Sequence, residues 1–153
     1  MKNISNFKGA KNRLEIVKRK KNCAIYKDFA HSPSKVKATT ISMKKQFPER
    51  KLVACLELHT YSSLNKKFMP QYCKSLDYAD IAIVYYNPKA ISLKKIKELK
   101  NSEIQEGFNK KSLLIFNDSN ELEKFIRSIA CENQNLLMMS SGNFDNIKIE
   151  NLI

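Results

Sequence analysis

The chain has little glycine and proline and no tryptophan, with 3 Gly, 4 Pro and 0 Trp in 153 residues. This scarcity excludes collagen-like repeats and flexible linkers. The sequence also contains no apolar run of about 18 residues, which a membrane-spanning helix needs, and residues 1–13 lack the apolar core of a signal peptide. We therefore expect a single soluble domain, residues 1–153, in the cytoplasm and without a membrane partner.

Motifs of metal binding and nucleophilic catalysis are absent. The 4 cysteines, at positions 23, 55, 73 and 131, have no C-x-x-C spacing and no paired histidines, so we expect no metal site. Cys23 and Cys55 lie in apolar runs, where a thiol usually behaves as a small hydrophobic side chain, which favours a reducing compartment. The sequence has no G-x-S-x-G elbow, no phosphate-binding G-x-x-x-x-G-K-[ST] loop and no G-x-G-x-x-G. The chain thus lacks the parts needed to bind a nucleotide by itself.

Positive charge is abundant, with a formal net charge of +13 and a pI near 9.6. Such a charge is typical of proteins that bind polyanions, and a basic nucleic-acid-binding module is one hypothesis. The lysine pairs and clusters are spread along the chain, however, and the aromatic residues do not group with them. This distribution favours a solvated surface, with a minority of lysines attracting phosphorylated ligands.

Short apolar runs alternate with segments of helical periodicity. An antiparallel hairpin is predicted from 14–17 and 23–26, and further strands at 52–56, 81–86, 113–116 and 136–139. Helices are predicted after Pro33, over 64–76 with a kink at Pro70, from 88 to 99, and from Asp118 or Ser119 to 129. Continuous apolar strands between amphipathic helices predict a Rossmann-like α/β fold: a mostly parallel sheet of about six strands, with helices on both faces.

Polar residues follow the carboxyl ends of these strands, where a parallel sheet forms its ligand crevice. Asp28 and His31 follow one strand, and Glu57 and His59 follow the next. A histidine beside a carboxylate can act as a general base or bind an anion. Ser32 is placed to cap the helix that Pro33 begins. A receiver-like signalling domain would need an acidic cluster here, and only Asp28 is well placed for that role.

Several segments, spread over almost the whole chain, have the form of family motifs. Phe7–Arg13 has the form F-x-G-x-x-x-R, and Asp28–Pro33 has the form D-[FY]-[AG]-H-x-P. In this order they resemble the entry segment and the signature of the C-terminal domain of the Mur ligases, which build bacterial cell-wall precursors. Segments 56–63 and 137–144 resemble the loop after the next strand and the terminal Gly-Asn turn.

The resemblance implies a three-domain enzyme of which this chain is only the last part. The full enzyme uses ATP and Mg to activate the carboxylate of UDP-N-acetylmuramate as an acyl phosphate, and an amine then attacks it to form an amide. By this resemblance, Arg13 and Asp28 would contact ATP, and His31 would be catalytic. Phe29, His59, Thr60 and Ser63 would contact the amine substrate. The domain alone should bind no cofactor tightly and show no ligase activity, because one charge-assisted hydrogen bond contributes only about 1.5–3 kcal/mol.

The resemblance leaves two amine substrates open. Alanine-adding members carry arginines in the loop that contains His59, where this chain has Thr60 and Ser63. Hydroxyl groups cannot form the planar bidentate clamp that arginine makes with a carboxylate. Phe29-Ala30 and Glu57 look closer to the muropeptide-recycling ligases, which attach the tripeptide L-Ala-γ-D-Glu-diaminopimelate. We therefore prefer the tripeptide, with L-alanine as the alternative.

Overall fold

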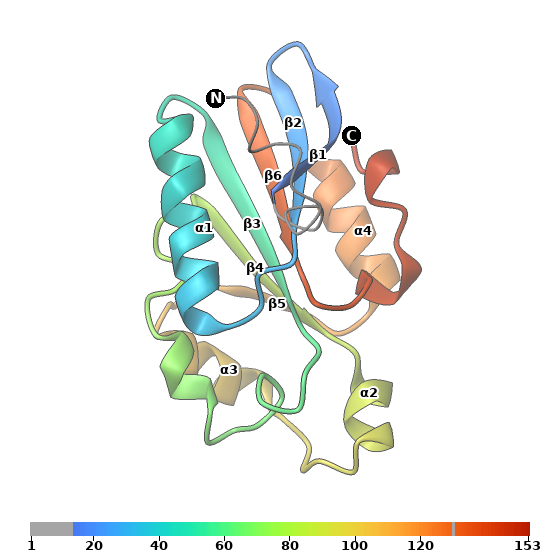
Figure 1. The fold of residues 1–153 in the computed structure, drawn as a ribbon. Coiled ribbons are helices and arrows are strands. Elements are labelled where there is room, and N and C mark those ends of the chain that lie inside the picture. Colours follow the sequence, from blue (N-terminus) through green and yellow to red (C-terminus); the bar gives the residue numbers. More distant parts are fainter. Residues whose placement is uncertain (1–13, 130) are drawn as a thin grey trace, which may run out of the picture.

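The computed structural model describes residues 14–129 and 131–153 (Figure 1). Its strands are β1 (Glu15–Lys20), β2 (Cys23–Asp28), β3 (Lys51–Leu58), β4 (Ile81–Tyr86), β5 (Leu114–Phe116) and β6 (Gln134–Met139). Its α-helices are α1 (Pro33–Gln46), α2 (Pro88–Leu93), α3 (Asn101–Phe108) and α4 (Ser119–Ser128), with short 3-10 turns η3 (Met69–Tyr72), η4 (Phe144–Asn146) and η5 (Ile149–Asn151). No helix within the described ranges is long and apolar enough to cross a membrane.

The strands form a six-stranded sheet in the order β1-β2-β6-β3-β4-β5. β1 and β2 are antiparallel, and every other neighbouring pair is parallel. The last strand, β6, therefore lies between β2 and β3, which brings the loops after these three strands to one edge. The predicted hairpin and mostly parallel α/β sheet are confirmed.

Alternating side chains divide the sheet residues between two cores. Leu52, Ala54 and Leu56 of β3 face α1 and α3, whereas Val53 and Cys55 face α4 and the C-terminal segment. Figure 1 shows α1 and α4 on opposite faces of the sheet. Because successive strand residues point to opposite faces, this alternation also decides to which side each polar residue at the strand ends projects.

Helix ends follow the sequence signals in most places. Pro33 begins α1 and Phe47 ends it, directly before Pro48. Ser32 is at the N-cap position of α1, as predicted, but its side chain makes no capping hydrogen bond. Asp118 is a true cap, because its carboxylate accepts hydrogen bonds from the backbone N–H groups of Asn120 and Glu121 in α4.

The predicted helix over 64–76 is wrong. Most of this segment consists of turns, with only η3 as a short 3-10 helix around Pro70. Leu64, Tyr72 and Leu76 are nevertheless fully buried, so their spacing reflects core contacts made by successive turns. The helix predicted over 88–99 ends at Leu93, and α3 is an additional helix that the prediction missed.

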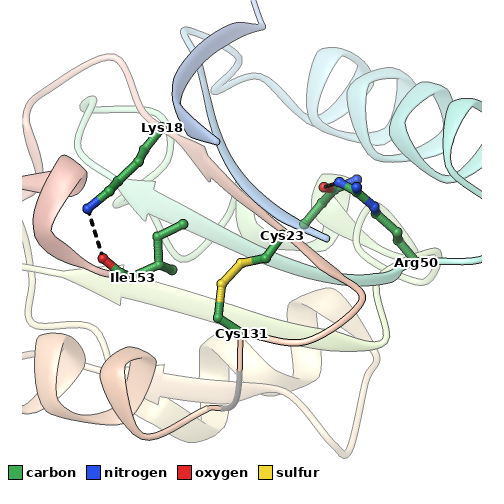
Figure 2. Close-up of a disulfide and its surroundings, with 6 residues drawn as sticks. Lys18, Cys23, Arg50, Cys131 and Ile153 are labelled. Carbon is green, nitrogen blue, oxygen red and sulfur yellow. Dashed lines mark hydrogen bonds between the residues drawn. A yellow bond between two sulfur atoms is a disulfide. The ribbon is translucent and has the colours of Figure 1, made fainter. Parts of the chain in front are cut away.

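The amino-terminal ends of the strands are joined by a disulfide that the sequence analysis did not predict. Cys23 at the start of β2 bonds to Cys131 just before β6, with a Cα–Cα distance of 5.7 Å and a sequence separation of 108 (Figure 2). Nearby, Lys18 donates a hydrogen bond of 3.1 Å to the carbonyl of Ile153. The expectation that Cys23 is a free hydrophobic thiol is therefore corrected, whereas Cys55 is free and buried.

Candidate functional site

The carboxyl ends of β2, β6 and β3 bring the predicted site segments to one edge of the sheet. Asp28 is paired with Met139 across β2 and β6, and the Asp28 carbonyl accepts a hydrogen bond of 3.1 Å from the N–H of Ser140. Leu56 of β3 is paired with Met139 on the other side of β6. His31 and His59 therefore lie in loops that leave the same edge, as the sequence pattern indicates.

The Asp28 carboxylate fixes the chain on the α1 face of this edge. Asp28 is only 7% exposed, and its Oδ1 accepts hydrogen bonds from the N–H groups of Leu14 and Phe29 at 3.0 and 2.9 Å. Its Oδ2 accepts a bond of 2.9 Å from the hydroxyl of Thr39 in α1. An ionised carboxylate offers about four acceptor positions, so these three bonds leave one acceptor position unused.

The backbone of the loop after β2 is fixed by a buried hydrogen bond, while the side chain of Phe29 in this loop stays exposed. The buried hydroxyl of Tyr72 donates a hydrogen bond of 2.6 Å to the carbonyl of His31, and burial raises the pKa of Tyr72. The His31 ring lies edge-on to the Phe29 ring at 5.5 Å, and its Nδ1 is 3.1 Å from the Phe29 carbonyl. Phe29 itself is 46% exposed. His31 thus has a fixed backbone, and an exposed aromatic ring beside it.

Thr60 and Ser63 bond to each other. The N–H of Thr60 donates to the Ser63 hydroxyl at 3.0 Å, and the N–H of Ser63 donates to the Thr60 hydroxyl at 3.1 Å. The two hydroxyls are 3.0 Å apart, and the Ser63 hydroxyl also donates to the Thr60 carbonyl at 3.1 Å. Because Ser63 is 1% exposed, the pair fixes the turn after His59 rather than presenting free hydroxyl groups.

Glu57 is the second buried carboxylate at this edge, and it lies on the α4 face. It is 3% exposed, and its Oε1 accepts hydrogen bonds from the Ser140 hydroxyl at 2.5 Å and from the N–H of Phe144 at 2.9 Å. Glu57 and Asp28 therefore lie on opposite faces of the sheet. Each already accepts hydrogen bonds from other parts of the chain, and no hydrogen bond between Glu57 and His59 or between Asp28 and His31 occurs within the described residues.

A further cluster that sequence reasoning missed joins β4 to the loop after β6. Asp145 Oδ2 accepts hydrogen bonds from the Tyr85 hydroxyl at 2.5 Å and from the Asn87 amide at 2.6 Å. Burial, followed by the hydrogen bond to Asp145, raises the pKa of Tyr85. Phe144, Asp145 and Asn146 have φ values of 51°, 55° and 65°, in the left-handed region that is costly for residues other than glycine. The only sequence signal was that 87–88 and 140–143 follow strands.

Of the predicted site residues, Asp28, Phe29, His31, His59, Thr60 and Ser63 are at this edge of the sheet. Arg13 and the segment Phe7–Arg13 lie outside the described residues. Within the described residues, no cluster of His, Cys, Asp and Glu could hold a metal ion.

Residues 12–142 match the family model of the Mur ligase glutamate ligase domain. The chain belongs to the Mur ligase family. This domain is the C-terminal one in these enzymes, and the predicted family is therefore confirmed.

Curated relatives support the same family. The UDP-N-acetylmuramate–L-alanine ligase of Sulfurihydrogenibium sp. is 30% identical over 142 residues, which cover 91% of this chain and 30% of the relative. The enzyme of the same name from Borreliella afzelii is 26% identical over 147 residues, covering 90% of this chain and 30% of the relative. This Mur ligase chain thus spans about 30% of the length of these relatives.

Solved structures share the fold. A domain assigned to a UDP-N-acetylmuramate:L-alanyl-γ-D-glutamyl-diaminopimelate ligase of Haemophilus ducreyi superposes with a TM-score of 0.65 at 26% identity, over 92% of this chain and 97% of that domain. A murein peptide ligase from Psychrobacter arcticus gives a TM-score of 0.67 at 22% identity, over 98% of this chain and 32% of that enzyme.

Proposed function

We propose that this chain is the amine-receiving domain of an ATP-dependent ligase of peptidoglycan recycling, which acts in the cytoplasm and joins L-Ala-γ-D-Glu-diaminopimelate to UDP-N-acetylmuramate. The observation that carries the choice of substrate is the Thr60–Ser63 pair. Its hydroxyl groups bond within the turn, and neither side chain can clamp a carboxylate as arginine does. A loop without such a clamp is poorly suited to a substrate as small as alanine. The likeness to the Haemophilus ducreyi domain that is assigned to a tripeptide ligase favours the same choice.

In this proposal, the loops after β2 and β3 receive the two substrates. The remaining acceptor position of Asp28 fits a ribose hydroxyl of ATP, and Arg13 would lie against the nucleotide. ATP supplies the phosphoryl group that activates the muramyl carboxylate, and Mg would be bound together with ATP in the full-length enzyme. Phe29 and His59 border the amine pocket, with Thr60 and Ser63 shaping its wall. His31 would accept a proton from the attacking amine.

L-Alanine is the alternative amine substrate, because the two curated relatives described above, which match nearly the whole chain, are UDP-N-acetylmuramate–L-alanine ligases. The two candidates make different products from the same UDP-N-acetylmuramate and ATP. The test therefore compares the two amines in one assay.

The experiment uses the full-length protein that contains this chain, or this chain together with the polypeptide that carries the central domain. ADP release and product mass are measured with the tripeptide or with L-alanine. We expect kcat/KM for the tripeptide to exceed that for L-alanine at least about tenfold, a transition-state difference of ~1.4 kcal/mol. A preference for L-alanine would replace the tripeptide proposal, and product formed by the chain alone would contradict the dependence on a central domain.

A further inference from the structure

The loop after β6, residues 140–146, wraps around a single carboxylate oxygen. Ser140 donates its hydroxyl proton to Glu57 Oε1 and accepts a hydrogen bond of 2.7 Å from the N–H of Gly142, while the N–H of Phe144 donates to the same Glu57 oxygen. Alternation along the strands places Glu57 and Ser140 on the same face, because Val53 and Cys55 of β3 and Leu136 and Met138 of β6 share the α4 core. One buried acid thus determines the path of this loop.

The same loop lies against the imidazole of His59. A Cβ atom built on Gly142 would be 3.0 Å from both Cγ and Cδ2 of the His59 ring and 3.2 Å from Glu57 Oε1. These distances are shorter than ordinary van der Waals contacts, so a side chain at position 142 would collide with the His59 ring. The backbone of Gly142 therefore lies directly beside the imidazole. A shift of this loop would therefore change the space that the imidazole occupies.

The arrangement of Glu57 and the 140–146 loop is energetically unfavourable in two respects, which indicates a role beyond packing. Glu57 is a nearly completely buried carboxylate, and no Lys or Arg forms a salt bridge with it among the described residues. Burying an acid without a cation is unfavourable, as is the left-handed backbone at Phe144. Burial raises the pKa of the Cys55 thiol, and the negative charge of the nearby Glu57 raises it further. Such costs concentrate at functional sites.

We propose that Glu57 is a positioning residue, which holds the 140–146 loop through Ser140 and Phe144 and thereby sets the position of His59 at the amine-binding edge. This inference rests on the proposed ligase function for its consequence, but its geometric part can be tested on the chain alone. Ser140 and Gly142 are the links between the carboxylate and the imidazole.

The first measurement is the NMR spectrum of the imidazole groups, which is simple because the chain has only 2 histidines. Glu57→Leu removes the acceptor, and we expect the ring signals of His59 to shift while those of His31 stay in place. Glu57→Gln keeps a carbonyl oxygen that can accept both hydrogen bonds, so it should restore the His59 signals. Gly142→Ala should shift the same signals by direct contact. Thr39→Val, which removes a bond on the opposite face, is the matched control and should leave His59 unaffected.

Ser140→Ala is the second variant, to be used where Glu57→Leu does not fold. Ser140→Ala removes the link to the loop and leaves the Glu57 carboxylate bonded to Phe144. Unchanged His59 signals in a folded Glu57→Leu or Ser140→Ala variant would overturn the positioning role.

The second measurement is the ligase assay described above. We expect Glu57→Leu to raise KM for the amine about tenfold with kcat changed less than about threefold, and Glu57→Gln to recover KM. An unchanged KM would overturn the positioning role even if His59 shifts. If the wild-type protein makes no amide with any amine, while the His59 signals respond as expected, the proposed function fails and the geometric coupling stands.

Discussion

The two edges of the sheet use their polar groups differently. At the amino-terminal edge, the Cys23–Cys131 disulfide joins β2 to the segment before β6, and Arg50 donates a hydrogen bond of 2.9 Å to Asn135. Asp80 there accepts bonds of 2.7 Å from the Lys44 ammonium and from the N–H of Leu52. At the carboxyl-terminal edge, by contrast, the Asp28 and Glu57 carboxylates bond mainly to loop backbone and hydroxyl groups, and the Thr39 hydroxyl of α1 also donates to Asp28.

The two edges therefore differ in what their contacts support: the amino-terminal edge serves stability, and we expect the carboxyl-terminal edge to serve binding as well. The amino-terminal edge holds strands and helices to one another. The carboxyl-terminal edge mainly holds loops in fixed shapes, with one bond from Thr39 of α1 to Asp28, and leaves Phe29 and Tyr61 46% and 64% exposed. Exposed aromatic rings on fixed loops are typical of a surface that receives a ligand or another domain. Substitutions at the amino-terminal edge should therefore change stability alone, and those at the carboxyl-terminal edge should change stability and binding together.

The largest effect is expected from the disulfide. Replacing Cys23 and Cys131 together by alanine removes a cross-link with a sequence separation of 108, and we expect the free energy of unfolding to fall by about 3–5 kcal/mol. Urea denaturation under oxidising conditions measures this loss, and a reductant should lower the stability of the wild type in the same way. Cys73→Ser, at an exposed free thiol, is the control and should be neutral. Equal stability of oxidised and reduced wild type would show that the cross-link contributes nothing in solution.

An intermediate effect is expected at Asp28. Asp28→Ala leaves the N–H groups of Leu14 and Phe29 and the hydroxyl of Thr39 without their acceptor, which should cost about 2–3 kcal/mol. Thr39→Val removes one of these bonds and should cost about 1 kcal/mol. In the full-length enzyme, Asp28→Ala should also raise KM for ATP, which Thr39→Val should change much less. Equal KM values for both variants would contradict a direct contact between Asp28 and the nucleotide.

The strand pattern could be predicted from sequence because it depends on local composition. The apolar run 81–86 is β4 to the residue, and the alternation of strands with helices gave the fold class. Helix α3 was missed, and it contains Gly107, a residue type that usually weakens a helix. Here Gly107 is required by close packing, since a Cβ atom at this position would lie 2.3 Å from Met69 Cγ.

The site could be predicted only in part. The loops carrying His31 and His59 follow from the position of the strand ends, and that part needs no coordinates. The partners of each carboxylate could not be predicted, because Ser140 and Phe144 lie 83 and 87 residues from Glu57 in sequence. The disulfide was missed for the same reason: only the insertion of β6 beside β2 brings Cys131 to Cys23.

The smallest effect is expected from Asp80 at the amino-terminal edge, and it should depend on pH. Although partial burial opposes it, the hydrogen bonds from Lys44 and Leu52 and the charges of Lys44 and Lys51 lower the pKa of Asp80 from its ordinary value of 3.8. Asp80→Asn keeps an acceptor for Leu52 but loses the charge, and because the Lys44–Asp80 pair is partly exposed the expected cost is about 0.5–1 kcal/mol at pH 7.

A lowered pKa in the folded state means that the stabilising contribution of Asp80 is complete above pH 3.8 and is lost as pH falls through the lowered value. The difference between the wild type and Asp80→Asn in urea denaturation should therefore shrink below this pH. Glu123→Gln, in the exposed pair with Arg127 on α4, is the matched control and should cost less, since that pair joins residues of a single helix. If the wild type and Asp80→Asn differ in free energy of unfolding by the same amount at pH 3 and at pH 7, the substitution destabilises the protein for a reason other than lost charge. The Lys44–Asp80 ion pair would then not stabilise this edge.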